Sequence, residues 1–396
     1  MDMTIISKHI AALTESQTLA MMSRVNQLRQ QGVDVVSLTL GEPDFDTPIH
    51  IKQAAQQAIA DNYSHYVPTK GILSLREAIS KHMPGYSPEE IIVSVGAKQS
   101  ICNAVIALVD EGDEVIIPTP CWVSYSEMVK IAGGTNVLMK TTADANYKIT
   151  SSQLREAITE RTKLLILCSP NNPTGSVYTK EEIAELIEVL KAHPNIYVIS
   201  DEVYDAIVYD EPMSELGNER WSELENRVVR VNGVSKRYAM TGYRIGWMAC
   251  HNKEILKACS ILQGQYLTCA CVVAQKAAEA ALSGSQECVD EMRKEYAKRK
   301  ELIMSMLNEI PDIHFVTPAG AFYVFPDVSK YYGRRFGDKT ITNSDDIVNY
   351  LLDEAHVACV AGSAYGEDTC IRLSFATCEA IIKEAMTRIK ESLLKL

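Results

Sequence analysis

Short apolar runs alternate with amphipathic segments along most of the chain. The runs cover residues 35–40, 91–95, 114–118, 163–168, 197–200 and 227–231, and most of them are continuously apolar. Such runs are typical of strands that are buried on both faces of a parallel sheet. Residues 180–190 instead carry apolar side chains at helical spacing, after a capping box formed by Thr179 and Glu182.

This alternation of strands and helices predicts an α/β fold with a mostly parallel central sheet flanked by helices. Ligands of such sheets bind at the carboxyl ends of the strands. Several polar motifs of this chain stand directly after the apolar runs. We therefore expect the functional site at that edge of the sheet.

The pattern changes beyond about residue 285. Residues 285–307 predict one long, charged helix, residues 377–394 predict a final amphipathic helix, and residues 15–31 also have helical character. Segments 318–320 and 331–339 show little periodicity and are predicted as loops. We predict a large domain at 44–285 and a smaller α+β domain formed by 1–43 plus 286–396.

Composition narrows the class of protein. The chain has 396 residues, of which 46% are hydrophobic, so it can bury a sizeable core without disulfides or metals. A net charge of -12 argues against non-specific binding of nucleic acid. No run of about 18 apolar residues predicts a membrane span, and the N-terminus does not resemble a signal peptide.

The cysteines indicate a reducing compartment. There are 11 of them, with no CxxC pair, and several lie in apolar runs. This usage predicts packed, reduced thiols in a cytoplasmic protein rather than a disulfide framework. Cys269 and Cys271 are two residues apart, but no further ligands near them indicate a metal site.

The strongest candidate for chemistry is the stretch NGVSKRYAMTGYRIGW at residues 232–247, which follows the apolar run 227–231. Burying the ammonium group of Lys236 is costly unless it is paired or neutralised, and a lysine that forms an imine avoids this cost. The hydroxyl of Ser235 and the guanidinium of Arg244 suit a phosphate monoester. Taken alone, a Ser-Lys pair is better explained by an exposed loop.

Five further motifs each have an ordinary structural explanation beside a functional one. A turn explains SPNNPTG at 169–175, a helix cap explains SDEVY at 200–204, and a simple αβ loop explains VGAKQ at 95–99. Core packing explains the tryptophan of PCWVSY at 120–125, and an internal salt bridge explains the arginine of IRLSFA at 371–376. LGEPDF at 40–45 completes the set.

Together, these motifs resemble those of the class I aminotransferases, which are fold-type-I pyridoxal phosphate enzymes, and most closely the bacterial-type aspartate aminotransferases. The motifs occur in the family's order, from Leu38 to Ala376. GAFY at 320–323 also matches and is expected to line the small-domain side of the site.

The resemblance implies a role for each cofactor residue. Lys236 holds pyridoxal phosphate as a Schiff base and moves a proton during the reaction. Asp201 pairs with the protonated ring nitrogen, so that the ring becomes an electron sink. Asn172 and Tyr204 bind the ring oxygen, and Trp122 lies against the ring. The phosphate is expected to bind to a group that comprises Gly96, Ala97, Lys98, Ser235, Arg244 and, from a neighbouring subunit, Tyr66.

The resemblance also implies how a substrate is held. Arg372 binds the α-carboxylate, with help from the Asn172 amide, while Gly41 lets the backbone approach and Trp122 forms a wall. Lys98 matches a lysine that is thought to bind a distal carboxylate. A lysine at a helix N-terminus is unfavourable for the helix dipole, which favours a functional explanation over a solvated one.

The expected activity is transfer of an amino group from an amino acid, with aspartate favoured, to a 2-oxo acid such as 2-oxoglutarate in a ping-pong reaction. Aromatic, alanine and prephenate substrates stay open, although residues 7–14 offer Lys8 and His9 but not the arginine expected for prephenate.

Two other classes of protein are alternatives. A carbon–sulfur β-lyase shares nearly all of these motifs, and a non-catalytic regulator is disfavoured by the presence of Lys236 and Arg372. If Tyr66 reaches a neighbouring site, the enzyme is a homodimer with shared active sites. The sequence assigns no role to Cys168 beyond packing.

Overall fold

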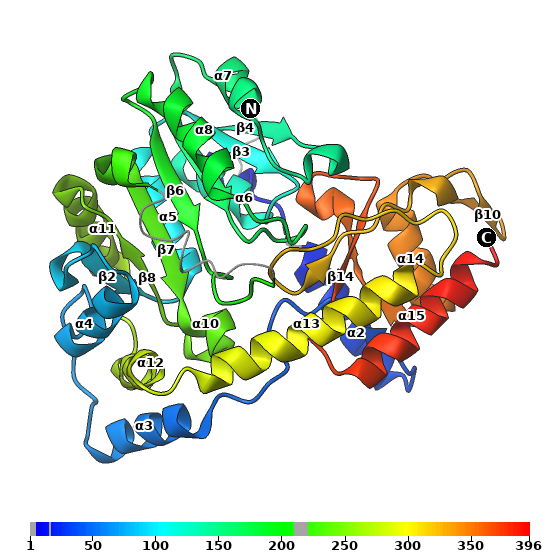
Figure 1. The fold of residues 1–396 in the computed structure, drawn as a ribbon, viewed down its shortest axis with the longest axis horizontal. Helices are drawn as coiled ribbons and strands as arrows, with labels where there is room; N and C mark the ends of the chain where they lie inside the picture. The colour runs from blue at the N-terminus through cyan, green and yellow to red at the C-terminus, as the bar shows by residue number, and fades with distance from the viewer. Residues whose placement is uncertain (1–4, 16, 210–220) are drawn as a thin grey trace.

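A seven-stranded sheet forms the centre of the larger part of the chain in the computed structural model, which describes residues 5–15, 17–209 and 221–396 (Figure 1). The strand order is β2-β8-β7-β6-β5-β3-β4. β8 runs antiparallel to β2 and β7, and the other neighbouring strands are parallel. The strands are β2 (Ile91–Ser94), β3 (Glu114–Thr119), β4 (Thr135–Lys140), β5 (Thr162–Cys168), β6 (Tyr197–Asp201), β7 (Val228–Gly233) and β8 (Gly246–Ala249). The predicted α/β fold with a mostly parallel sheet is therefore confirmed.

Helices cover both faces of this sheet, which explains why its strands are continuously apolar. Side chains of β5 alternate between two cores, with Leu164 and Ile166 on one face and Leu165 and Leu167 on the other. The first core includes α5 (Ala97–Leu108), α6 (Ser124–Ala132) and α11 (Lys253–Tyr266). The second includes α7 (Ser151–Ala157) and α8 (Lys180–Lys191), and a third, near β2 and β8, includes α3 (Ile49–Ala60), α4 (Leu73–His82) and α12 (Val272–Ser283).

Helix α8 shows how local sequence determines an element here. Thr179 caps it with the predicted capping box, in which its hydroxyl accepts from the Glu182 amide and the Glu182 side chain accepts from the Thr179 amide. Its apolar positions Ile183, Leu186 and Ile187 are buried against the sheet.

The smaller part of the chain surrounds short strands. β1 (Val36–Ser37) pairs with β12 (Val357–Ala358) in parallel, while β13 (Val360–Ala361), β14 (Ile371–Ser374) and β9 (Tyr323–Val324) form an antiparallel sheet. The helices around them are α2 (Gln17–Gln30), α14 (Ser344–Glu354) and α15 (Glu379–Leu393). The other short elements are α1 (Lys8–Ala11), α10 (Val234–Arg237), the hairpin β10 (Arg335–Phe336) with β11 (Lys339–Thr340), and 3-10 turns at Pro88–Glu90, Ala143–Ala145, Ser222–Arg227, Thr241–Tyr243, Ser329–Tyr331 and Gly362–Tyr365.

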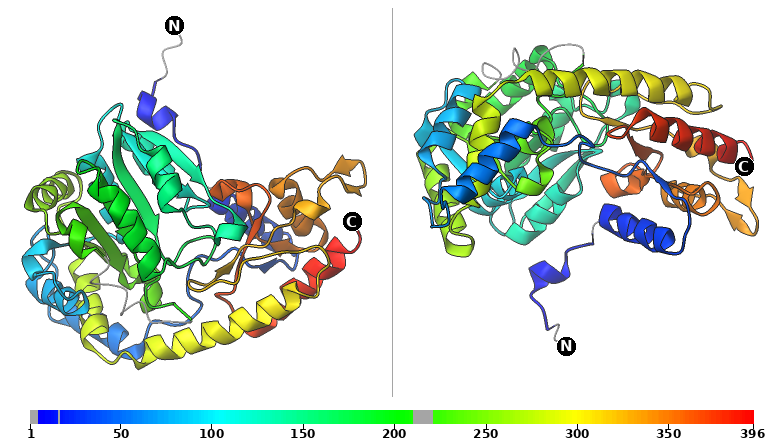
Figure 2. Two further views of the ribbon diagram at one scale, coloured as in Figure 1. Left: turned by 45° about the horizontal axis from the view of Figure 1, so that its top comes forward. Right: turned by 90° about the horizontal axis from the view of Figure 1, so that it is seen from below.

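The long helix α13 (Glu287–Leu307) connects the two parts and runs along both of them (Figures 1 and 2). Its Arg299 binds Asp44 at 2.7 Å, which fastens the helix to the segment where the predicted domain boundary falls. Val36 and Leu38 pack in one core with α13 and α15. The division at residues 44 and 285 stays a prediction.

Several sequence predictions need correction. The run 35–40 forms only the two-residue β1, and the segment 331–339, predicted as a loop, contains the β10 strand and begins β11. β4 was not predicted, because as an edge strand it exposes Thr135, Leu138 and Lys140 and so has no apolar run. β8 was also not predicted, because its residues were assigned to the lysine motif, although all four of them are buried. No helix among the described residues has the length and apolar character needed to cross a membrane.

Candidate active site

A cavity of about 450 Å³ lies at the carboxyl ends of β5, β6 and β7 and is closed on its other side by β9 and β14. It brings together most of the side chains that the sequence singled out. The predicted residues that line it are Gly41, Ala97, Lys98, Trp122, Asn172, Asp201, Tyr204, Ser235, Lys236, Arg244 and Arg372. Gly96 begins α5 beside the cavity, whereas Tyr66 does not line it.

Lys236 lies on α10, the short helix that directly follows β7. Its ammonium nitrogen donates a hydrogen bond to the carbonyl oxygen of Gly41 and lies 6.0 Å from the centre of the Phe322 ring. Burial lowers the pKa of Lys236 to about 8, against the raising effect of Glu42 and with a further lowering by Arg372. A substantial fraction of this lysine is therefore a neutral amine near pH 8.

Asp201 is the last residue of β6 and is almost wholly buried. One of its oxygens accepts from the Tyr125 hydroxyl at 2.6 Å, and the other accepts from the Val203 amide at 3.2 Å. Burial raises the pKa of Asp201 to about 6, although both hydrogen bonds favour the carboxylate. At neutral pH this group is an anion that faces the cavity.

Tyr204 follows β6, and its hydroxyl lies 2.9 Å from the hydroxyl of Tyr323. Its ring packs edge-on against Phe322 and Tyr323. Asn172 lies in the loop after β5 and accepts from Arg372 at 3.1 Å. Both polar groups thus line the cavity and are hydrogen-bonded to protein partners. A ligand oxygen could add to these hydrogen bonds or replace them.

The start of α5 lies against the guanidinium of Arg244. Gly96 precedes the helix with a φ of 78°, and a Cβ at that position would collide with the Arg244 guanidinium. Only glycine therefore allows this arginine to lie over the helix start. The guanidinium is held by the Thr241 carbonyl at 3.0 Å, and Ser235 lines the same side of the cavity. Free amides, a helix N-terminus, a hydroxyl and a guanidinium are the chemistry of a phosphate site.

Arg372 on β14 is buried, and the structure explains how its charge is tolerated. Its two terminal nitrogens donate to Asn172 and, at 2.7 Å, to the Thr39 carbonyl, and its guanidinium lies 4.5 Å from the centre of the Tyr323 ring. No carboxylate pairs with it among the residues that the structure describes, so the internal salt bridge considered from the sequence does not form. Its Nε is buried without a hydrogen-bond partner. An incoming carboxylate is the natural counterion for this group.

Trp122 and Lys98 form one wall of the cavity. The Trp122 ring is held edge-on by Tyr125, at 5.4 Å between centres, and the Lys98 ammonium lies 4.7 Å from the centre of the Trp122 ring. Burial and the nearby Arg244 lower the pKa of Lys98. The ammonium group is thus directed toward the cavity, where a second anionic group could bind.

Several residues of the cavity were missed in the sequence. Glu42 stands beside Gly41 and accepts a hydrogen bond from Thr241 at 2.6 Å, and Tyr125 lies one helical turn after Trp122. Both lie within motifs already singled out, LGEPDF and PCWVSY, so these motifs could have indicated them. Met22 and Tyr365 also line the cavity, and no sequence signal pointed to either.

Tyr66 is the one predicted site residue that the structure leaves apart, with 88% of its surface exposed. Ile49, Ile59 and Leu73 are also exposed, on α3 and α4 to either side of it in the sequence. A surface with several large exposed apolar side chains is typical of an interaction site.

The fold thus places a buried, partly neutral lysine in one cavity with the side chains of Arg244 and Arg372. A family model for aminotransferases of class I and II matches residues 33–389. The aspartate/prephenate aminotransferase of Cereibacter sphaeroides is 41% identical over 394 residues, which cover 98% of each chain.

Two solved structures are similar over nearly the whole chain. The aspartate aminotransferase of Rhizobium meliloti is 38% identical, with a TM-score of 0.93 over 99% of this chain and 100% of the other. The aspartate aminotransferase of Thermus thermophilus with maleate is 36% identical, with a TM-score of 0.91 over 98% and 100%. The chain belongs to the class I and II aminotransferase family and is a transaminase.

Proposed function

We propose that this enzyme transfers the amino group of aspartate to a 2-oxo acid such as 2-oxoglutarate, with pyridoxal phosphate held at Lys236. The observation that carries the proposal is one cavity lined by a buried lysine, a buried carboxylate and a buried arginine, which are Lys236, Asp201 and Arg372. Each of these groups is costly to bury without a ligand that uses its charge.

The residues present fit pyridoxal phosphate at both of its ends. The amides at the start of α5, Ser235 and Arg244 would hold the phosphate, and the cradle at Gly96 exists because a side chain there would displace Arg244. Asp201 would face the ring nitrogen, and Trp122 offers a flat wall. When bound, the cofactor supplies an electron sink for the substrate's α-carbon.

Lys236 would take the proton from the α-carbon of the substrate. Its pKa of about 8 leaves a larger fraction of it as the neutral amine near neutral pH than in an exposed lysine, so more of it is ready to accept a proton. The Gly41 carbonyl would hold the ammonium form after the transfer, since it already accepts from this nitrogen.

Arg372 would bind the α-carboxylate of each substrate. Its Nε has no hydrogen-bond partner, and its bonds to Asn172 and Thr39 fix the plane of the guanidinium. A fixed, planar fork of donors suits a carboxylate better than a flexible ammonium group does.

Lys98 supports a dicarboxylic substrate. Its ammonium lies over Trp122 on the cavity wall, where a distal carboxylate of aspartate or 2-oxoglutarate could reach it. The names of the similar proteins agree with this choice, since they include aspartate aminotransferases and one of these was solved with maleate.

Prephenate is a second candidate substrate, because the Cereibacter relative is named for both substrates. The described N-terminal residues favour aspartate. They contribute Met22, Leu40, Gly41 and Glu42 to the cavity but no arginine. Lys8 and His9 lie on α1, which packs against α6 rather than beside the cavity.

We further propose that the enzyme is a cytoplasmic homodimer. The exposed ring of Tyr66 and the exposed apolar side chains of α3 and α4 support a surface that binds a second copy of this chain. In that dimer Tyr66 would reach the phosphate site of the partner. All 11 cysteines are free thiols, which supports a reducing compartment.

The decisive experiment is an assay of the purified enzyme with pyridoxal phosphate, aspartate and 2-oxoglutarate. We expect oxaloacetate and glutamate, with double-reciprocal plots that stay parallel as the second substrate is varied. Cystathionine serves as the competing substrate. Release of pyruvate from cystathionine without any transfer from aspartate would reject the proposal in favour of a β-lyase.

A further inference from the structure

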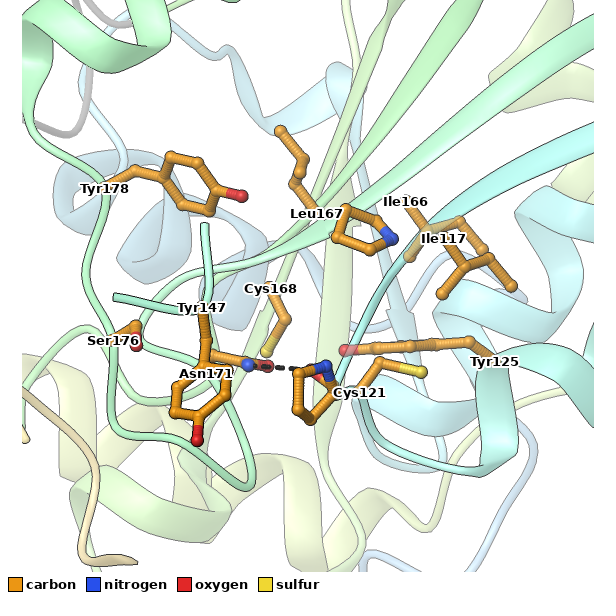
Figure 3. Close-up of a pocket in the computed structure, with 12 residues that line it drawn as sticks. Ile117, Cys121, Tyr125, Tyr147, Ile166, Leu167, Cys168, Asn171, Ser176 and Tyr178 are labelled. Atoms are coloured by element: carbon orange, nitrogen blue, oxygen red, sulfur yellow. Dashed lines mark hydrogen bonds between the residues drawn. The ribbon is translucent and has the colours of Figure 1, made fainter. Parts of the chain in front are cut away.

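Tyr125 lies directly behind the carboxylate of Asp201. It is on α6 and is 1% exposed, and its hydroxyl donates to Asp201 Oδ2 at 2.6 Å. Figure 3 shows this side chain reaching toward Cys168 in a small cavity of about 20 Å³. Tyr125 lines both this small cavity and the active-site cavity, so it connects the core with the site.

We propose that Tyr125 is a positioning residue that fixes Asp201 as a carboxylate, so that Asp201 can bind the protonated ring nitrogen of pyridoxal phosphate. The inference rests on the proposed function and adds a residue to it. Its basis is the short hydrogen bond between the buried side chains of Tyr125 and Asp201. The other oxygen of Asp201 already accepts from the Val203 amide.

The electrostatics of this pair explain why a donor is needed. Burial raises the pKa of Asp201 to about 6, and the hydrogen bond from Tyr125 is the largest influence that opposes this rise. Lys236 also lowers the pKa, whereas Glu202 raises it. Without the Tyr125 hydroxyl, the anionic form would lose its main stabilising contact, and a protonated Asp201 cannot pair with a cationic ring nitrogen.

The other ionisable groups near Asp201 cannot take over this role. Glu202 is bound to Arg230 at 2.6 Å and cannot donate a proton as a carboxylate. The Cys168 thiol donates to the Pro170 carbonyl at 3.3 Å and also interacts with the Tyr125 hydroxyl, and burial raises its pKa, so it stays neutral. Tyr204 is paired with the Tyr323 hydroxyl.

The position of Tyr125 is fixed by the same helix start that supplies the wall of the site. Trp122 packs edge-on against it, with ring planes at 88°. Burial, together with Asp201 and Cys168, raises the pKa of Tyr125 well above its ordinary value, so its hydroxyl stays protonated near neutral pH and can donate. A displaced Tyr125 would therefore alter both the packing of the Trp122 ring and the hydrogen bond to the Asp201 carboxylate.

The test is Tyr125→Phe, which keeps the ring and removes only the hydroxyl. Two probes are titrated into the cofactor-free protein, namely pyridoxal phosphate and its analogue with C–H in place of the ring nitrogen. We expect the Kd of pyridoxal phosphate to rise roughly tenfold or more, since a hydrogen bond to a charged group is lost. The Kd of the analogue should stay unchanged, because it has no ring nitrogen for Asp201 to bind.

Tyr147→Phe is the matched control. Tyr147 is also buried and lines the same small cavity, but its hydroxyl contacts Cys370 at 3.4 Å and not Asp201. This variant should bind both probes as the wild type does. Tyr125→His, which keeps a ring donor, should recover part of the preference for pyridoxal phosphate over the analogue, and this ratio decides the matter if Tyr125→Phe does not fold.

The outcomes separate this inference from the proposed function. A wild-type protein that takes up no pyridoxal phosphate rejects the proposed function. A wild type that binds it, beside a Tyr125→Phe variant that binds both probes unchanged or weakens both equally, overturns the role of Tyr125 alone. A Tyr125→His variant with no more preference for pyridoxal phosphate than Asp201→Asn overturns it as well.

Discussion

Arg372 and Asn172 join the two parts of the chain across the active-site cavity, with Nη1 donating to Oδ1 at 3.1 Å over a sequence separation of 200 residues. One side chain comes from a strand of the small sheet and the other from the loop that ends β5. The arginine's position thus depends on both parts, and so does any carboxylate that it binds.

Replacing this arginine tests its proposed role. Arg372→Lys keeps the charge but loses the planar fork, so we expect kcat/KM to fall roughly 100-fold for both aspartate and 2-oxoglutarate. Steady-state kinetics of each half-reaction measure this. Arg388→Lys is the control, because Arg388 binds Asp34 and Glu384 on the surface. Equal kinetics in the two variants would exclude Arg372 from substrate binding.

Asp201 makes the stability of the cofactor-free protein depend on pH. Folding raises its pKa from 3.8 to about 6, so the folded chain binds more protons than the unfolded chain within that window. The contribution of Asp201 to stability therefore falls by about 3 kcal/mol as the pH rises from about 4 to 6 and then stays level. Asp201→Asn should remove this loss.

Denaturant unfolding of the two cofactor-free proteins between pH 4 and 8 measures the effect. The variant should equal the wild type near pH 4 and become more stable than it above pH 6. Asp144→Asn, at an exposed position, should follow the wild type throughout. A difference between wild type and Asp201→Asn that does not vary with pH would contradict the buried carboxylate.

The sheet and most of the site could be predicted from the sequence because both depend on local patterns. Strands buried on two faces leave continuous apolar runs, and parallel strands carry their motifs to one edge, so Asn172, Asp201 and Lys236 meet as expected. The edge strand β4 lacked a long apolar run and was missed, whereas β8 is apolar throughout but was assigned to the lysine motif.

Contacts between distant segments could not be predicted in this way. The sequence gives no distance between Tyr125 and Asp201 or between Glu42 and Thr241, because each pair depends on how separate elements pack. The role expected of Tyr66 depends on a second chain, because this residue does not line the cavity of its own chain. Its exposure is what a shared site requires, but the partner is a second chain.

Lys98 should decide the preference for a dicarboxylic substrate. In Lys98→Ala we expect kcat/KM for aspartate to fall roughly tenfold to 100-fold, because one charge-assisted contact is lost, while that for alanine stays the same. Lys163→Ala is a matched control, since Lys163 lies over the Tyr197 ring at 5.5 Å but does not line the cavity. An unchanged ratio of aspartate to alanine activity would show that the assignment is wrong.

The exposed apolar surface around Tyr66 should form the dimer. Ile59→Asp places a charge where 66% of an isoleucine is now exposed, and burying that charge against a second copy is costly. We expect the dimer to dissociate in analytical ultracentrifugation and activity to fall with it. Leu394→Asp, which changes a residue of 59% exposure near the C-terminus, should leave the dimer intact. A monomeric wild type with full activity would reject the shared site.

Lys236→Ala separates binding of the cofactor from catalysis. The groups that would hold the phosphate, including Ser235, Arg244 and the start of α5, do not depend on Lys236, so pyridoxal phosphate should still bind, which equilibrium dialysis can measure. Turnover should fall by a factor of about 10²–10⁴ or more, because the proposed base is lost along with the covalent anchor. Lys300→Ala, which removes a buried lysine over the Tyr209 ring, is the control for burial alone. Retained turnover in Lys236→Ala would mean that another group moves the α-proton.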